Sequence, residues 1–284
     1  EKHILYSVTK SFASAGIGIA IDQSLINDVD EPRMSFFPKY AGSSLDTREM
    51  RKISLENVLT MTTGLSWDEW FTPYGDDRNS ATQLSRSNKW INFVLQSQII
   101  SDPGERFLYS SGNSILLSEI LKNVSGRSAE AFIAENLLKP IGIHDWEWDN
   151  GPGGLSNTGW GLHLTPRDMI KFGQLYLQKG VWEGQQIISQ AWVEQSTRPH
   201  VSAGSDSNYG YQWWLFSEEN SFIRALQVND VASARGYGGQ LIFVIPHLDM
   251  VIAMTAGNYT SGGNPFGILQ FHIFPAIIYA DPIN

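Results

Sequence analysis

Ser7 and Lys10 form the only serine–lysine pair at a spacing of three among the nine lysines of the chain. On a helix, residues three apart project from one face, so the serine hydroxyl and the lysine ammonium would come within hydrogen-bonding distance. A lysine whose pKa is lowered by burial or nearby cations can take the serine proton, which makes the hydroxyl a nucleophile. About one accidental match to this pattern is expected in such a chain, so an ordinary amphipathic helix is the alternative.

The residues after Ser7 predict the helix that the pair requires. Val8, Phe12, Ala15 and Ile19 recur at intervals of four, three and four, which is a helical apolar stripe. Ser7 would then lie in the first turn, where unpaired backbone N–H groups and the positive end of the helix dipole favour an alkoxide or oxyanion. This position suits a nucleophile.

The composition indicates a folded, enzyme-sized protein. The chain has 284 residues, of which 42% are hydrophobic and 12% aromatic. It has no run of eighteen apolar residues, and its first six residues lack a signal pattern, so no membrane span is predicted. A net charge of −9 and scattered arginines argue against nucleic acid as a partner and leave a small-molecule substrate.

The sequence predicts no cofactor and no metal. It has no cysteine, no dinucleotide-binding glycine motif and no P-loop, and its six histidines never stand four apart. A Gly-x-Ser-x-Gly element is also missing, so a histidine-based triad has no support.

Start and stop signals predict a mainly helical region over residues 7–200. Ser54 can cap a helix that stops at Gly64, and a second helix is expected over Ser114–Val124. Thr165, followed by proline and an acid, predicts the start of a helix that runs to Gly180, and another helix is expected near Ser189.

The region over residues 208–284 is predicted to hold an antiparallel sheet and a C-terminal helix. Runs of β-branched and aromatic residues predict four strands, with a tight turn from Pro246 to Asp249 between the last two: 209–216, 222–228, 240–245 and 250–255. An apolar segment over 265–280, interrupted at Pro275, should cover one face of this sheet.

Further segments, in order along nearly the whole chain, carry a family resemblance. Phe107 to Asn113 resembles the second motif of the serine β-lactamase and penicillin-binding-protein superfamily, and Ala234 to Gln240 resembles its third. The segments 55–65 and 164–168 are similar to other family signposts. The resemblance is to the class C-like branch, which includes esterases, D-aminopeptidases and 6-aminohexanoate-dimer hydrolases.

The resemblance implies an α/β (α+β) fold over residues 1–284 as a single domain, with the active site between the helical region and the sheet. It implies that Ser7 forms an acyl-enzyme, while Lys10 and the Tyr109 phenolate move its proton and later activate water. A tyrosine hydrogen-bonded to a lysine ammonium is expected to have a lowered pKa. Without the resemblance, Tyr109 would be interpreted as an aromatic packed at a helix start.

The resemblance also implies an oxyanion site made by the backbone N–H groups of Ser7 and Tyr237. Gly236 and the glycines after it would let substrate approach the strand backbone, with a glycine-rich turn as the alternative. Aromatic residues after Gly64 could wall the pocket or pin a surface loop: Trp67, Trp70, Phe71 and Tyr74.

Departures from the family pattern bear on the substrate. Ala234 stands where β-lactam-binding members have lysine or histidine, Arg235 follows it, and Ser111 stands where many β-lactamases have asparagine. Arg235 could hold a carboxylate, but strand alternation points it away from the face of residue 234. We therefore expect an esterase or amidase acting on small acyl compounds. The alternatives are a β-lactamase or DD-peptidase, and a catalytically silent binding module of the same fold.

The start of the chain is a further departure. The family has a helix and the first strands of the sheet before the nucleophile, whereas six residues precede Ser7 here. The expectation is that the sequence is a processed or partial chain, or that a companion N-terminal segment completes the sheet, which would otherwise have an exposed edge. The sequence leaves the oligomeric state open, and a periplasmic or secreted location follows from the resemblance alone.

Overall fold

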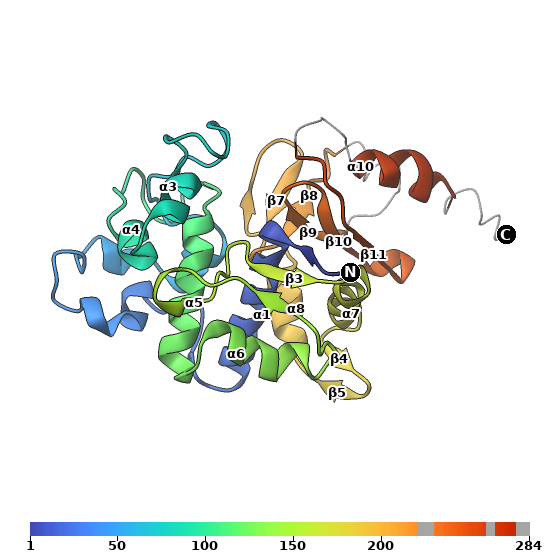
Figure 1. Cartoon of the computed structure of the whole chain (residues 1–284), viewed down its shortest axis with the longest axis horizontal. Helices are drawn as coiled ribbons and strands as arrows, with labels where there is room; N and C mark the ends of the chain where they lie inside the picture. The colour runs from blue at the N-terminus through green and yellow to red at the C-terminus, as the bar shows by residue number, and fades with distance from the viewer. Residues whose placement is uncertain (221–229, 260–264, 277–284) are drawn as a thin grey trace.

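The computed structural model describes residues 1–220, 230–259 and 265–276, and one six-stranded antiparallel sheet dominates its later part (Figure 1). The strands lie in the order β11-β10-β9-β8-β7-β6, so each pairs with its neighbour in sequence. Their bounds are β6 Val201–Ser202, β7 Ser207–Tyr209, β8 Trp214–Phe216, β9 Ala232–Gly236, β10 Gln240–Ile245 and β11 Met250–Met254. Together with the helices described below, this sheet confirms the predicted α/β (α+β) class.

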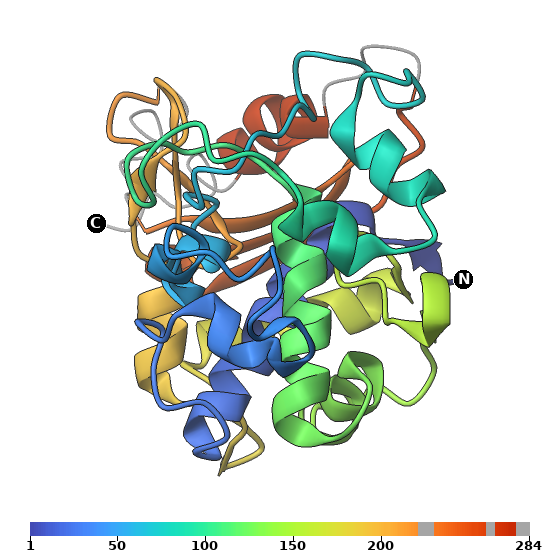
Figure 2. The ribbon, with the colours of Figure 1, turned by 90° about the vertical axis from the view of Figure 1, so that its left-hand side faces the viewer.

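Both faces of the sheet are covered, which explains why β10 is buried at every position. Ile242 and Val244 point to one face and join the main core, against which helix α7 (Pro166–Leu177) packs. Leu241 and Phe243 point to the other face, where the C-terminal helix contributes Leu269 and Phe274. Figure 2 shows the large helical region on one side of the strands and the C-terminal helix on the other.

Helix α1 (Thr9–Asp22) lies at the centre of the helical region and is buried on all sides from Thr9 to Ala20. It packs against α5 (Ser111–Ser125), α6 (Ala129–Ile133) and α8 (Gln190–Ser196). The predicted helix is confirmed, but it is not amphipathic, because it is enclosed by helices and sheet together. Small residues permit this close packing: a Cβ added at Gly18 would overlap the indole ring of Trp192.

The remaining elements are short. Besides short 3₁₀ and π-helical turns, the described ranges hold three more α-helices, a small sheet ordered β1-β3-β2, and the hairpin of β4 with β5: α2 Leu55–Leu59, α3 Ser80–Arg86, α4 Trp90–Leu95, β1 His3–Ile4, β2 Glu147–Trp148, β3 Leu162–Leu164, β4 Val181–Trp182 and β5 Gln185–Gln186.

The predicted helix starts are confirmed by capping hydrogen bonds. The side chains of Ser54, Thr165 and Ser189 each accept a backbone N–H three residues later. Helix α5 begins three residues before the predicted Ser114, because Ser110 accepts the N–H of Asn113 and so acts as the N-cap.

The strand predictions over 240–245 and 250–255 are confirmed, with the tight turn between them. The single strand predicted over 209–216 is wrong: β7 and β8 are two strands joined by a tight turn. Gln212 has a left-handed φ of 62° in this turn, and its side-chain amide donates to the carbonyls of Val58 and Leu59. The run predicted over 222–228 lies outside the described residues.

The C-terminal helix is described from Pro265 to residue 276, as α10 (Pro265–Ile268), a π-helical turn (Leu269–Ile273) and one further helical turn. Pro275 lies inside this helical run and does not interrupt it there. A proline ring clashes with the carbonyl four residues earlier, which here belongs to the π turn, whose carbonyls are displaced from α-helical positions. The predicted part after 276 lies outside the described residues.

β11 ends the large sheet and pairs only with β10 among the described strands. Its five residues are all partly exposed. A companion segment along this edge stays a prediction. Within the described ranges, no helix is both long enough and apolar enough to cross a bilayer.

Candidate active site

The chain enters the site through a strained turn. Tyr6 has a left-handed φ of 47°, which non-glycine residues seldom adopt, and it begins a 3₁₀ turn (Tyr6–Val8) that leads directly into α1. Ser7 therefore lies in the first turn, as predicted, where its N–H has no partner within the helix.

Lys10 is buried, with 1% of its surface exposed, and lies directly below Ser7. Its Nζ donates to Ser7 Oγ at 3.1 Å, to Ser111 Oγ at 3.0 Å and to the Gly159 carbonyl at 2.6 Å. Burial lowers the pKa of Lys10 to about 8, and the negative charge of Glu69 opposes this effect. The amine can therefore lose its proton at mildly alkaline pH.

Tyr109 is also buried, and it lies close enough to Ser7 for the serine side chain to influence its pKa. The predicted lowering of its pKa is wrong. Burial and the charge of Glu69 raise the pKa of Tyr109, and the Ser7 side chain offsets this only in part. Lys10 faces the ring of Tyr109, 5.3 Å from its centroid, and stabilises a phenolate less than a contact with the hydroxyl would. Tyr109 is a phenol in the free protein.

Glu69 is a site residue that the sequence interpretation missed. Only 4% of it is exposed, and its carboxylate accepts hydrogen bonds from Trp67, Tyr74 and both the N–H and the hydroxyl of Ser111. An acid in a polar loop is usually exposed, so the sequence gives no direct sign that Glu69 is buried. The available signal was the set of aromatic donors within five residues of it.

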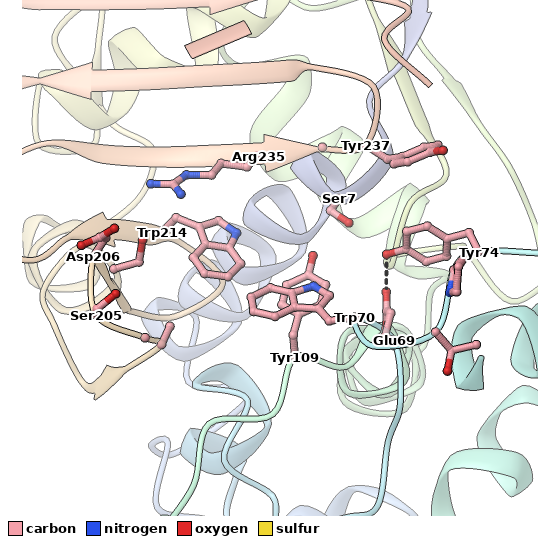
Figure 3. A pocket seen from close by; sticks show the side chains of 16 residues that line it. Ser7, Glu69, Trp70, Tyr74, Tyr109, Ser205, Asp206, Trp214, Arg235 and Tyr237 are labelled. Atoms are coloured by element: carbon pink, nitrogen blue, oxygen red, sulfur yellow. Dashed lines mark hydrogen bonds between the residues drawn. The ribbon is translucent and has the colours of Figure 1, made fainter. Parts of the chain in front are cut away.

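A cavity of about 630 Å³ opens above Ser7 between the helical region and the sheet (Figure 3). Trp70 forms one wall and stacks on Tyr109 at 5.2 Å and on Trp214 at 5.5 Å between ring centroids. A second hollow of about 350 Å³ lies on the other side of Tyr74 and also reaches Ser7. Ser7 thus lines both spaces.

Ser111 and Trp67 differ in their access to these spaces. Ser111 is buried but lines the second hollow, next to Lys10. Trp67 is buried and lines a neighbouring hollow of about 530 Å³, not the cavity above Ser7. Trp70 and Tyr74, from the same aromatic segment, line the cavity, and Phe71 is largely exposed.

On the sheet side, Arg235 lines the cavity and Ala234 does not. Ala234 is buried in the main core, which corrects our expectation that residue 234 faces the substrate. The Arg235 guanidinium lies about 5 Å from the rings of Trp214, Phe216 and Phe266. Figure 3 shows it at the end of the cavity away from Tyr237.

The Arg235 guanidinium has few polar partners. Its Nε donates to Ser233 Oγ at 2.9 Å, and its buried Nη2 has no hydrogen-bond partner in the described part of the chain. Burial lowers its pKa to about 10, so it remains a cation at neutral pH.

Gly236 ends β9 against the turn that carries Ser7. A Cβ at this position would overlap the carbonyl oxygen of Leu5, so the glycine is needed for the approach of two protein backbones. Tyr237 follows directly, half-exposed, with its ring against Tyr6 at 5.6 Å. Ser7 and Tyr237 both line the cavity. Across the described ranges, no cluster of three metal-ligating side chains occurs.

The chain belongs to the Beta-lactamase family, whose model matches residues 1–265. It is 26% identical over 273 residues to 6-aminohexanoate-dimer hydrolase of Paenarthrobacter ureafaciens, covering 89% of this chain and 65% of that protein. It is 24% identical over 196 residues to D-alanyl-D-alanine-carboxypeptidase/endopeptidase AmpH of Escherichia coli (strain K12), covering 62% of this chain and 49% of that one. The chain thus spans less than two thirds of each of these relatives.

A solved structure supports the fold. EstCE1, described as a hydrolase with promiscuous acyltransferase activity, matches with a TM-score of 0.75 at 16% identity, over 97% of this chain and 84% of its own. The family resemblance predicted from the motifs is confirmed.

Proposed function

We propose that the protein is a serine hydrolase that forms an acyl-enzyme on Ser7 and acts on small esters or amides. The observation that carries this proposal is the 3.1 Å contact between Ser7 Oγ and the buried Nζ of Lys10, a lysine whose pKa is lowered to about 8. Such a lysine is a base of suitable strength near neutral pH.

In the acylation step, neutral Lys10 takes the Ser7 proton as Ser7 Oγ bonds to the substrate carbonyl carbon. The Tyr109 hydroxyl then gives its proton to the leaving alkoxide or amine as the carbonyl–heteroatom bond breaks. This step ends with an acylated Ser7, a Lys10 ammonium and a Tyr109 phenolate. The opposite charges of the ammonium and the phenolate attract each other and sum to zero.

In the deacylation step, the Tyr109 phenolate takes a proton from water, and the resulting hydroxide attacks the acyl carbon. Ser7 Oγ leaves and recovers its proton from Lys10, which restores the starting state. A phenol with a raised pKa gives a strongly basic phenolate, well suited to activating water.

The backbone N–H groups of Ser7 and Tyr237 are the proposed donors to the oxyanion. Both belong to fixed backbone, the first at a helix start and the second beyond the end of β9. Preorganised donors of this kind stabilise a developing negative charge without rearrangement. In this proposal Gly236, Ser111 and Trp67 shape the surroundings of the bound substrate.

Small uncharged acyl compounds are the first choice of substrate, because five aromatic side chains line the cavity. A second candidate is a β-lactamase or DD-peptidase activity. The Arg235 guanidinium favours it, because this cation lines the cavity, its Nη2 has no hydrogen-bond partner among the described residues, and it could bind a substrate carboxylate. A silent binding module is a weaker choice, since it needs no lysine base beneath a serine.

The test is covalent labelling with a fluorophosphonate, with the modified residue located by mass spectrometry, beside turnover of nitrophenyl butyrate and nitrocefin. The proposal expects one label on Ser7 and faster turnover of the butyrate. Faster turnover of nitrocefin would place the β-lactamase candidate first. The absence of both label and turnover would contradict enzymatic function.

A further inference from the structure

The hydrogen bonds of Glu69 fix the direction of a neighbouring hydroxyl. Its Oε2 accepts the indole N–H of Trp67 and the backbone N–H of Ser111, both at 2.7 Å. Its Oε1 accepts the Ser111 hydroxyl at 2.6 Å and the Tyr74 hydroxyl at 3.0 Å. A carboxylate can only accept, so the single hydroxyl hydrogen of Ser111 is committed to Glu69.

This commitment makes Ser111 an obligatory acceptor toward Lys10. The Ser111 oxygen lies 3.0 Å from Lys10 Nζ and has no hydrogen left to donate. The Gly159 carbonyl, 2.6 Å from the same Nζ, also can only accept. Two of the three positions around the amine therefore require an N–H.

The third neighbour of the amine is Ser7. A neutral amine has two N–H bonds and one lone pair in tetrahedral directions. With both N–H bonds held by Ser111 and Gly159, the lone pair is directed at the remaining neighbour, Ser7 Oγ, at 3.1 Å. A lone pair aimed at the Ser7 hydroxyl is what proton removal requires.

We propose that Glu69 is a positioning residue for acyl transfer, which acts through the Ser111 hydroxyl to aim the lone pair of neutral Lys10 at Ser7. This inference rests on the proposed function, in which Lys10 is the base that activates Ser7. It assigns Ser111 to the orientation of Lys10 in addition to any contact with substrate.

Glu69 also holds the loop that carries Trp67 and Tyr74, so a structural role has to be separated from this one. Glu69→Gln separates them. The two N–H donors that face Oε2 require the glutamine carbonyl there, so its NH₂ takes the place of Oε1. That NH₂ donates to the Ser111 oxygen, and the freed Ser111 hydroxyl can donate to the Lys10 lone pair. Ser111 then competes with Ser7 for the base.

A double-mutant cycle tests this reversal with nitrophenyl butyrate as substrate. We expect E69Q to lower kcat by roughly ten- to a hundredfold and S111A to lower it several-fold, because S111A removes an orienting acceptor but adds no competing donor. In the S111A background, E69Q should change kcat by less than about threefold, since the residue through which it acts is gone. An equal loss in both backgrounds would overturn the inference in favour of a loop anchor.

The pH profile provides a second readout, because it reports whether the charge of Glu69 acts on Lys10. Glu69 acts on the titration of four buried or half-buried groups, Lys10 and the tyrosines 74, 109 and 209, and its charge raises the pKa of each. The tyrosines titrate far above neutral pH. Loss of the Glu69 charge should therefore shift the acid limb of kcat/KM, set by Lys10, to lower pH while the plateau falls. If E69Q lowers the plateau of kcat/KM but leaves the pH of its acid limb unchanged, the proposal is contradicted.

Glu56→Gln is the matched control, because Glu56 also accepts a tyrosine hydroxyl, that of Tyr211, but lines neither the cavity nor the second hollow. It should leave kcat and the pH limb unchanged. If E69Q does not fold, the S111A variant tests the inference alone, because it keeps the hydrogen bond from the backbone N–H of residue 111 to Glu69. A kcat of S111A equal to that of the parent would overturn the inference. Turnover by S7A would refute the proposed function itself, whereas a dead S7A with a fully active E69Q would refute only the role of Glu69.

Discussion

The two sides of the cavity are built differently. On the helical side, Lys10, Tyr109, Glu69 and Ser111 are buried, and Ser111 is hydrogen-bonded to both Lys10 and Glu69. Burial shifts the pKa of Lys10 down and that of Tyr109 up. On the sheet side, Arg235 is packed among aromatic rings with few polar contacts. In the proposed mechanism, proton transfer therefore belongs to the helical side, and contact with the variable part of the substrate belongs to the sheet side.

Removal of the nucleophile should have the largest effect. Ser7→Ala deletes one hydroxyl at the junction of the two spaces and no buried packing, so the protein should stay folded. We expect ester turnover to fall by at least about a thousandfold and fluorophosphonate labelling to be lost. Measured turnover within tenfold of the parent would show that the chemistry does not pass through Ser7.

Loss of either proton carrier on the helical side should lower kcat by roughly a hundredfold. Lys10→Met keeps the buried volume and Tyr109→Phe keeps the ring. In the parent, kcat/KM should rise with pH through about 8, as Lys10 loses its proton, and this rise should vanish in Lys10→Met. The double variant should lose much less than the product of the single losses, because a relay acts as a unit. If the loss in the double variant equals the product of the two single losses, Lys10 and Tyr109 act independently.

Gly236→Ala tests the close contact between the end of β9 and the turn that carries Ser7. The added methyl would overlap the Leu5 carbonyl, so the end of β9 must move away from the turn of Ser7. We expect a loss of about 1–3 kcal/mol of folding free energy, together with a fall in kcat larger than the change in KM. Chemical denaturation and steady-state kinetics measure both. Parent-like stability would show that the contact is loose.

The smallest effect should come from the sheet side and depend on the substrate. Arg235→Gln removes a cation that lines the cavity, and the comparison uses a nitrophenyl monoester of glutarate against nitrophenyl valerate. We expect kcat/KM to fall about tenfold more for the glutarate ester, since a charge-assisted hydrogen bond is lost for that substrate alone. Equal losses for both would assign Arg235 to the packing of its three rings.

Local patterns predicted much of the fold. The capped starts at Ser54 and Thr165 and the strand at 240–245 depend on neighbouring residues, and each was confirmed. The turn between β7 and β8 was missed, because Gln212 is held there by carbonyls of α2, which lie far away in sequence. A strand pattern carries no trace of such a partner.

The candidate site divides in the same way. Ser7 and Lys10 are neighbours on one helix turn, so their contact could be predicted from spacing. The role of Glu69 could not, because its burial depends on Ser111 meeting the loop from another helix. The face of β9 was also misjudged, since alternation fixes that residues 234 and 235 point oppositely but not which of them meets the core.

The contact of Gly236 with Leu5 can form only after β9 has been translated. On the ribosome, Ser7 leaves the exit tunnel long before β9 is translated, and α1 can meet α5 and the loop of Glu69 while the rest of the chain is still being made. Such a nascent chain carries its base and its nucleophile but lacks the backbone of Tyr237. Translation products that stop before β9 should therefore be inert toward acylating reagents, because they lack the proposed oxyanion donor of Tyr237.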